Sequence, residues 1–405
     1  MRSRLRVKSR DAGGRDRLGI YVDDVYRITE IDGRNRVSAD RAFLLFACEV
    51  GAGFERLVLF GRAIESEQPA DYVLREDVEL VELPYYETLA DLRGFFRVSA
   101  ATPREMWRGL DRVDRVWIFG PHPFALALAV LARLRGRKVV LGVRQDTPEY
   151  YRARLPSRRW LPALAGIRLL DLTFRSLGRR FGVTVVGRTV AGRYGASDGS
   201  VFPMTVSLVR AADVADAPPD LDWSGTIELL TIGRLAPEKN PFLLLDALAR
   251  LDAGDTGRFR LTWVGRGELA EAVDGYAADA GIASLVTRLG YVPHGAELFG
   301  LYRRSHVFVH VSLTEGVPQV LVEAVAAGTP IVATDVGGVR DAVADGRAAV
   351  LVPPRDVEAL VRAVRTIVED PAVRSQLAIA REAPARTATL EHETERVARF
   401  VAGER

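Results

Sequence analysis

The sequence predicts an α/β protein made of two doubly wound, parallel-sheet domains. Apolar segments of strand length alternate with segments of helical periodicity over most of the 405 residues, a pattern typical of parallel sheets with crossover helices. A stretch rich in proline and aspartate, residues 212–225, divides this alternation into two series, as a linker would. The length also leaves room for two domains.

The first domain is predicted over residues 17–211. Its strands are expected at 17–22, 56–60, 113–119, 138–143 and 183–186, with helices at 39–50 and 125–134. Residues 1–16 are basic and contain Asp11-Ala-Gly-Gly14 rather than an apolar run. We therefore expect a disordered start and no signal peptide.

The second domain is predicted over residues 226–386. Its strands are expected at 226–232, 260–264, 286–289, 307–311, 331–334 and 349–352. A polar, charged helix over residues 387–405 follows. Because ligands bind at the carboxyl ends of the strands in open parallel sheets, we expect a ligand cleft between these edges of the two domains.

Composition narrows the classes of partner. The net charge is only +3 and is spread along the chain, so we expect no nucleic-acid partner. The single cysteine, Cys48, rules out a disulfide framework within the chain and fits a cytoplasmic location. No run reaches the length of a membrane-spanning helix. No cluster of histidine and cysteine has metal-ligand spacing, so we expect no metal site.

The most informative segment is Glu315-Gly-Val-Pro-Gln-Val-Leu-Val-Glu323. A strand is expected just before it, and Pro318 suits the first turn of a helix that ends at Gly328. Glu315 should therefore lie in a loop at the carboxyl end of a strand, and Glu323 one to two turns into the next helix. The amino terminus of that helix suits a phosphate group.

This segment resembles the signature of the retaining nucleotide-sugar glycosyltransferases of family four, in which two glutamates are separated by seven residues. Neighbouring sequence segments match the family pattern as well: Ser312-Leu-Thr-Glu-Gly316, the stretch from Glu323 to Pro330, and Thr334-Asp-Val-Gly-Gly338. The resemblance is strong over residues 225–353 and covers the N-terminal half in outline. It implies the GT-B fold, with two Rossmann-like domains facing across a cleft and the last helix crossing back to the first domain. The alternative is two solvated helix carboxylates.

The resemblance also implies roles for the residues of this motif. Glu323 would accept hydrogen bonds from the ribose hydroxyls of the donor. Glu315 would bind the hydroxyls of the donor sugar and is a candidate catalytic residue. Gly316 and Val317 would offer backbone N–H groups beside it.

A second candidate segment is Gly233-Arg-Leu-Ala-Pro-Glu-Lys-Asn240, which follows the first strand of the second domain. It matches the Gly-Arg and Lys-Asn loop of the family. Arg234 and Lys239 would stabilise the negative charge that grows on a leaving diphosphate, an effect that is largest in the transition state. An ordinary loop with solvated charges is the alternative.

Three further residues are donor-side candidates: Gly265 from its place in a glycine turn, and Tyr291 and Val292 because their segment resembles the family segment beside the base. Gly265, in a glycine pair after a strand, would let the backbone approach the nucleotide. Tyr291 and Val292 would stack on the base or bond it through the backbone. Core packing by Tyr291 is an equal alternative.

The N-terminal half departs from the family pattern. Val22-Asp-Asp-Val-Tyr-Arg27 stands where many members have a Gly-Gly loop. Arg144 ends a strand where many have a histidine, and His122 ends the preceding strand. We regard both as candidate acceptor-side residues, with a structural role as the alternative for His122. The basic helical region 152–181 either packs on the first sheet or lies on an anionic membrane surface.

Together these features predict a retaining, metal-independent glycosyltransferase of the hexosyltransferase type. It would transfer a sugar from a nucleotide-diphosphate sugar to a hydroxyl acceptor, either a polysaccharide, a glycolipid or a small-molecule glycoside. No cofactor is expected, and the location is expected to be cytoplasmic, with the inner face of the membrane as a peripheral alternative. A nucleotide-sugar epimerase of the same fold and a non-catalytic nucleotide-sugar-binding partner are the alternatives. The base, the sugar, the acceptor and the oligomeric state stay open.

Overall fold

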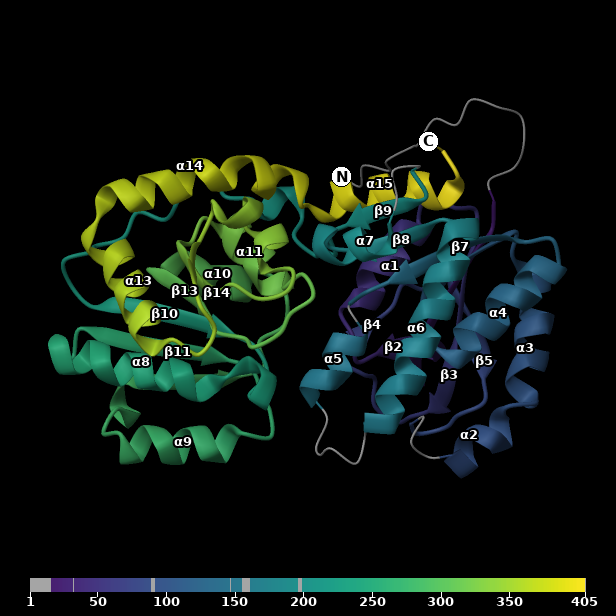
Figure 1. Cartoon of the computed structure of the whole chain (residues 1–405), viewed down its shortest axis with the longest axis horizontal. Coiled ribbons are helices and arrows are strands. Elements are labelled where there is room, and N and C mark those ends of the chain that lie inside the picture. The colour runs from purple at the N-terminus through teal and green to yellow at the C-terminus, as the bar shows by residue number, and fades with distance from the viewer. Residues whose placement is uncertain are drawn as a thin grey trace.

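The computed structural model describes residues 16–31, 33–88, 92–145, 147–154, 161–195 and 199–404. The described chain forms two mainly parallel sheets, each with helices packed around it, which lie side by side in Figure 1. This confirms the predicted fold class. The expected disordered start falls in residues that lie outside the described ranges, apart from residue 16.

The first sheet has nine strands, whose order is β4-β2-β1-β6-β7-β8-β9, with β3 on β1 and β5 on β3. Its strands are β1 (Leu18–Ile31), β2 (Arg34–Ala39), β3 (Leu57–Glu65), β4 (Tyr72–Val73), β5 (Val78–Leu83), β6 (Arg115–Gly120), β7 (Lys138–Val143), β8 (Val183–Val186) and β9 (Val201–Met204). Its helices are α1 (Phe43–Gly51), α2 (Leu92–Val98), α3 (Ala101–Gly109), α4 (Pro123–Leu134), α5 (Thr147–Arg154), α6 (Leu161–Phe181) and α7 (Arg188–Tyr194).

This sheet has four strands that were not predicted, β2, β4, β5 and β9, and its first strand is longer than predicted. We expected the first strand to end near residue 22, but β1 continues to Ile31 and pairs there with β2, which runs antiparallel to it. Short β4 then pairs antiparallel with β2. The first helix consequently begins at Phe43 rather than near residue 39. The alternating burial of β1 beyond Val22 is the two-residue period of a strand with one covered face.

The second sheet has six parallel strands in the order β12-β11-β10-β13-β14-β15. They are β10 (Ile227–Ile232), β11 (Phe259–Val264), β12 (Val286–Gly290), β13 (Val307–His310), β14 (Ile331–Thr334) and β15 (Val350–Val352). The helices are α8 (Pro241–Gly254), α9 (Ala270–Asp279), α10 (Ala296–Arg304), α11 (Gln319–Ala327), α12 (Val339–Ala342), α13 (Val357–Glu369), α14 (Pro371–Thr387) and α15 (Leu390–Ala402).

The last two helices link the halves. Helix α14 spans from the second half towards the first, and α15 lies on the first half, as the yellow ribbon in Figure 1 shows. Helix α15 packs against α1 and β9. Its buried Glu393 accepts a hydrogen bond from the backbone N–H of Thr205 at 3.1 Å.

No helix in the described part of the chain is both long enough and apolar enough to span a membrane.

Candidate active site

The carboxyl edges of the two sheets meet at a junction. Arg144 follows β7 and Gly316 follows β13, and the carbonyl oxygen of Arg144 lies 3.3 Å from where a Cβ on Gly316 would stand. Gly187 follows β8, and a Cβ there would come within 2.8 Å of the side chain of Val317. Because these positions all follow the carboxyl ends of parallel strands, the predicted residues Arg144, Gly316 and Val317 lie at the edge where ligands bind in this kind of sheet.

At this junction Glu315 forms the centre of a charged cluster. Its Oε1 accepts a hydrogen bond from Nζ of Lys239 at 2.5 Å and from Nε2 of His310 at 3.0 Å. The Glu315 side chain is 11% exposed. Burial by itself raises its pKa, but the Lys239 charge and the His310 hydrogen bond outweigh burial and lower the pKa well below its usual range. Glu315 is therefore a carboxylate at neutral pH.

His310 was not among the predicted site residues. It is the last residue of β13, five positions before Glu315. A histidine at the carboxyl end of an otherwise apolar parallel strand is a signal that could have identified it, since such a side chain lies at the ligand edge. Its proximity to Lys239 depends on the tertiary structure.

Glu323 lies in a different environment, although it is part of the same motif. It is buried on α11, and its Oε2 accepts a hydrogen bond from the hydroxyl of Tyr302 at 2.8 Å. Nε2 of His294 lies 3.8 Å from its Oε1, too far for a hydrogen bond. Burial raises the pKa of Glu323 to about 7, against the opposing effect of the Tyr302 bond. The two glutamates thus have opposite pKa shifts.

The loop after β10 carries both candidate cations, and they lie in different surroundings. Lys239 is partly buried against Glu315. Arg234 is 62% exposed and pairs with Glu238 at 2.7 Å. Asn240 adopts a left-handed conformation with φ of 51°, and Pro241 then begins α8. This sharp exit orients the end of the loop towards Glu315.

Glycines allow the loops of the site to pack backbone against backbone. A Cβ on Gly265 would lie 2.0 Å from the carbonyl oxygen of Gly233, and Gly265 has a φ of +136°. A Cβ on Gly337 would lie 2.0 Å from the carbonyl oxygen of Glu315. No side chain fits at either position. The loops after β10 and β13 are therefore each held by a neighbouring glycine turn.

The two residues after β12 have separate environments. Tyr291 is 36% exposed, and its hydroxyl donates a hydrogen bond to that of Tyr72 at 3.1 Å. Val292 is buried in the core. Core packing was the alternative considered for Tyr291, but it is the Val292 side chain that packs in the core.

On the N-terminal side, His122 belongs to a buried polar network. The backbone N–H of Phe124 donates to its Nδ1 at 3.2 Å, so Nδ1 is an acceptor and the neutral ring carries its proton on Nε2. Nε2 lies 3.1 Å from the hydroxyl of Tyr86, which donates to Asp23 at 2.6 Å. Burial lowers the pKa of His122. These contacts fit the structural alternative, since His122 also caps α4.

Arg144, the other acceptor-side candidate, lies at the junction. Its guanidinium stacks 5.0 Å from the centre of the Phe43 ring. Its positive charge also favours ionisation of Asp24, whose pKa is nevertheless raised because burial dominates. Arg144 therefore places a cation near Asp24 of β1 and Phe43 of α1, and its backbone lies beside the loop that carries Glu315.

Helix α6 carries most of the described part of the basic region 152–181. It buries Phe174 and Leu164, while Leu169 and Leu172 are 66% and 60% exposed. The helix therefore packs on the first sheet and also presents apolar side chains to solvent. Arg158 and Trp160, which are part of this prediction, lie outside the described residues.

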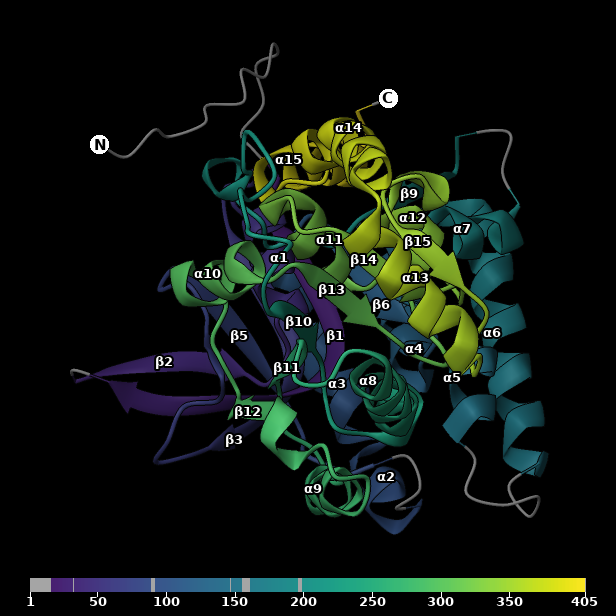
Figure 2. The same cartoon turned by 90° about the vertical axis from the view of Figure 1, so that its left-hand side faces the viewer.

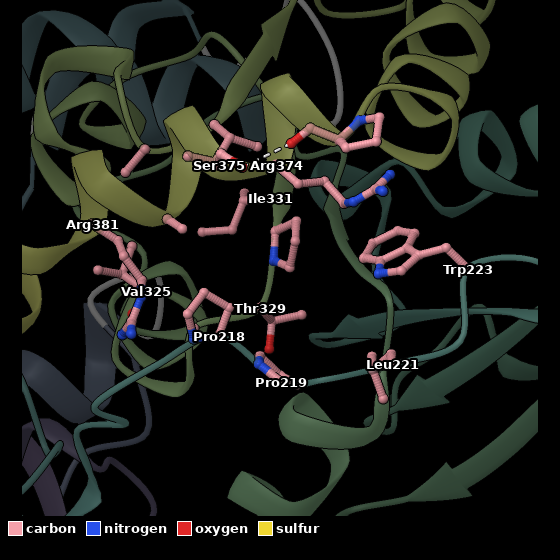
Figure 3. Close-up of a pocket in the computed structure, with 16 residues that line it drawn as sticks. Pro218, Pro219, Leu221, Trp223, Val325, Thr329, Ile331, Arg374, Ser375 and Arg381 are labelled. Atoms are coloured by element: carbon pink, nitrogen blue, oxygen red, sulfur yellow. Dashed lines mark hydrogen bonds between the residues drawn. The ribbon is translucent and has the colours of Figure 1, made fainter.

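A separate cavity of about 260 Å³ lies between the linker segment and α14. Figure 3 shows Trp223 and Arg374 on the right of the cavity, Arg381 on the left, and Pro218 and Pro219 below. Both arginines donate to backbone carbonyls, and Arg374 also stacks on Trp223 at 4.2 Å. We assign this cavity no role in the reaction.

Among the described residues, no group of three or more histidine, cysteine or acidic side chains could hold a metal ion.

Comparison with known proteins places these features in a family. Residues 217–384 match the family described as Glycosyl transferases group 1. A D-inositol 3-phosphate glycosyltransferase of Frankia alni is 41% identical over 166 residues, which are 39% of this chain and 40% of the relative. A glycogen synthase of Mycobacterium tuberculosis is 36% identical over 155 residues, 38% of this chain and 37% of the relative. The chain thus spans about two fifths of the length of these relatives.

The solved structures match over nearly the whole chain. HepE of Anabaena, in complex with UDP and glucose, has a TM-score of 0.68 at 16% identity and covers 96% of this chain and 99% of its own. Sucrose-phosphate synthase of Thermosynechococcus elongatus has a TM-score of 0.69 at 17% identity, with 95% and 98% covered. At this identity the likeness shows the fold. The chain has the GT-B fold, and residues 217–384 match the Glycosyl transferases group 1 family.

Proposed function

We propose that this protein is a retaining glycosyltransferase that moves a hexose-type sugar from a nucleotide-diphosphate sugar to a hydroxyl acceptor. The observation that carries the proposal is the Lys239–Glu315 pair at the junction of the sheets, with the second carboxylate of the motif, Glu323, buried on the next helix. The family match covers this half of the chain.

The charge of each group suits a distinct part of the donor. Lys239 has three N–H bonds, so it can keep its bond to Glu315 and also donate to a diphosphate oxygen. Arg234 is exposed on the same loop and can swing towards the same phosphates. Both would stabilise the charge on the leaving group as the bond to the sugar breaks. Glu315, ionised by its partners, would accept hydrogen bonds from the sugar hydroxyls.

Glu323 would serve the ribose. Its pKa of about 7 means that it is partly protonated in the free protein at neutral pH. Two ribose hydroxyls donating to it would favour the charged form and so draw the proton off. The backbone N–H groups of Gly316 and Val317 lie at the start of the same segment, close to where the sugar would bind.

Because the anomeric configuration would be retained without a separate nucleophile, we propose that the diphosphate leaves and the acceptor attacks on the same face of the sugar. The bond from C1 to the diphosphate oxygen breaks, and the acceptor oxygen forms the new bond to C1. The released diphosphate oxygen takes the proton of the acceptor hydroxyl. Arg144 is proposed to contact the acceptor, and His122 is proposed to support the acceptor side from its buried network. On this view the residues 17–211 form the acceptor domain, 212–225 the linker, 226–386 the donor domain and 387–405 the returning helix.

The donor and the location form the finer part of the proposal. HepE was solved with UDP and glucose, so UDP-sugars are the first donors to test. We propose a cytoplasmic enzyme, because nucleotide sugars are the donors. The exposed leucines of α6 would serve a membrane-bound acceptor, and co-sedimentation with anionic vesicles tests that point.

A thermal-shift panel of nucleoside diphosphates, followed by product analysis with candidate donors, tests the function. A ligand that binds only the native state raises the melting temperature. We expect one nucleoside diphosphate to do so and the product to keep the anomeric configuration of the donor by NMR. An epimerised nucleotide sugar would identify the epimerase instead. Binding without turnover on any acceptor would favour the non-catalytic partner.

A further inference from the structure

Two tyrosines, one from each half, meet at the junction. The hydroxyls of Tyr72 and Tyr291 are 3.1 Å apart. Tyr72 lies on β4 of the first half, and Tyr291 follows β12 of the second. In Figure 1 β2 and β4, which pair with each other, lie on the side of the first half that faces the second, and in the view of Figure 2 the purple strand β2 passes close to β12. The pair is thus a direct contact between the two sheets.

The position of Tyr72 is set by regular structure. Beyond Tyr26, β1 pairs antiparallel with β2, and β2 pairs with β4 through Ala39 and Tyr72. This three-stranded extension is one of the parts of the first sheet that the sequence did not predict. Because Tyr72 is held by a ladder and not by a free loop, its ring is positioned by the first half as a whole.

The pair also lies within electrostatic range of the proposed ribose carboxylate, Glu323. Burial is the main cause that raises the pKa of Tyr72, followed by its bond to Tyr291, and the charge of Glu323 contributes as well. Gly290, just before Tyr291, accepts a hydrogen bond from Gly265 at 2.6 Å. Tyr291 is therefore fixed beside the glycine turn that would approach the nucleotide, with Tyr72 opposite it.

We propose that Tyr72 closes the nucleoside end of the donor site, so that the base is enclosed by an aromatic residue from each half. The inference rests on the proposed function. In the ligand-free protein the two hydroxyls bond each other, and a bound base would lie against the tyrosine rings. A planar base stacks well on an aromatic ring. Recognition of the base then requires both halves, whereas the phosphates need only the second.

Calorimetry on the full chain separates these contributions. The probes are UDP, ADP and GDP, together with inorganic pyrophosphate, which has no base. We expect Tyr72→Ala to weaken the best-bound nucleoside diphosphate about tenfold and to leave pyrophosphate within about twofold. Tyr72→Phe keeps the ring and should stay within about threefold of wild type. Tyr85→Ala, at a tyrosine that is 43% exposed in the same half, is the matched control and should change neither.

Tyr291→Ala serves as the second variant, because this residue lies on an exposed loop and its removal should not impair folding. It should show the same base-selective loss. An equal loss of pyrophosphate and nucleotide in both alanine variants would overturn the inference, as would unchanged binding of both. If the wild-type protein binds no nucleoside diphosphate, the proposed function itself fails. If it binds one and Tyr72→Ala has no effect, only the present inference fails.

Discussion

Replacing Glu323 by glutamine should stabilise the ligand-free protein above pH 7 while weakening nucleotide binding. Glu323 is buried, and its partner within hydrogen-bond distance is the hydroxyl of Tyr302. Ionising it in this environment opposes folding. Glutamine keeps the shape and can still accept from Tyr302, but it carries no charge to bury.

The magnitude follows from the pKa. Burial raises the pKa of Glu323 from 4.5 to about 7. Since each pKa unit corresponds to about 1.4 kcal/mol, ionisation lowers the free energy of unfolding by about 3 kcal/mol. Because the pKa of this acid is higher in the folded state than in the unfolded state, the protein loses stability as the pH rises. The free energy of unfolding is unaffected below pH 4.5, falls between pH 4.5 and pH 7, and has lost the full amount above pH 7.

Thermal unfolding of wild type and Glu323→Gln at pH 5 and pH 8 measures this effect. For a folding unit of 150–250 residues, about 3 kcal/mol corresponds to roughly 6–12 °C in melting temperature. The two proteins should differ little at pH 5, and the variant should melt higher at pH 8. Glu271→Gln, at an exposed position on α9, is the control.

Nucleotide titration completes the experiment. The variant should bind a nucleoside diphosphate about ten- to hundredfold more weakly, because hydrogen bonds to a charged group are worth about 1.5–3 kcal/mol. Identical pH dependence of melting in wild type and Glu323→Gln would refute the burial argument. Unchanged nucleotide affinity would refute the ribose role.

Three further predictions concern the rest of the site. In steady-state kinetics, Lys239→Ala and Arg234→Ala should each lower turnover by about a hundredfold or more, with a smaller effect on donor binding. Lys239→Ala should also lower the melting temperature, because it leaves the buried carboxylate of Glu315 without its cation. Glu315→Gln should spare free nucleotide within about twofold and weaken the intact nucleotide sugar, and equal losses in the two titrations would contradict its sugar role. Gly337→Ala should lower the melting temperature, because the new Cβ would lie 2.0 Å from the Glu315 carbonyl oxygen. The control is Gly275→Ala, whose Cβ would have no atom within 4 Å and which should stabilise α9 by up to about 1 kcal/mol. A loss of stability at Gly275 as large as that at Gly337 would contradict the steric argument.

Much of the architecture could be predicted because it depends on local patterns. The periodicity of apolar residues predicted the alternation of strands and helices in both halves. The order of strand, loop and helix placed Glu315 at a sheet edge and Glu323 on α11. The extension formed by β2 and β4 was missed because both strands are short. Strand β2 is also polar and is stabilised by pairing with the far end of β1, and β4 pairs in turn with β2.

What the motif residues do chemically depended on the tertiary structure. Glu315 and Glu323 are the same residue type eight positions apart, yet one has a lowered and the other a raised pKa. The difference comes from partners supplied by other elements: Lys239, 76 positions from Glu315, and Tyr302 on α10. Sequence alone placed Glu315 in the loop after a strand and Glu323 on the following helix, since local periodicity sets those elements. Only folding decided which one is charged, because the energy of a charge depends on burial and on neighbours that are distant in the chain.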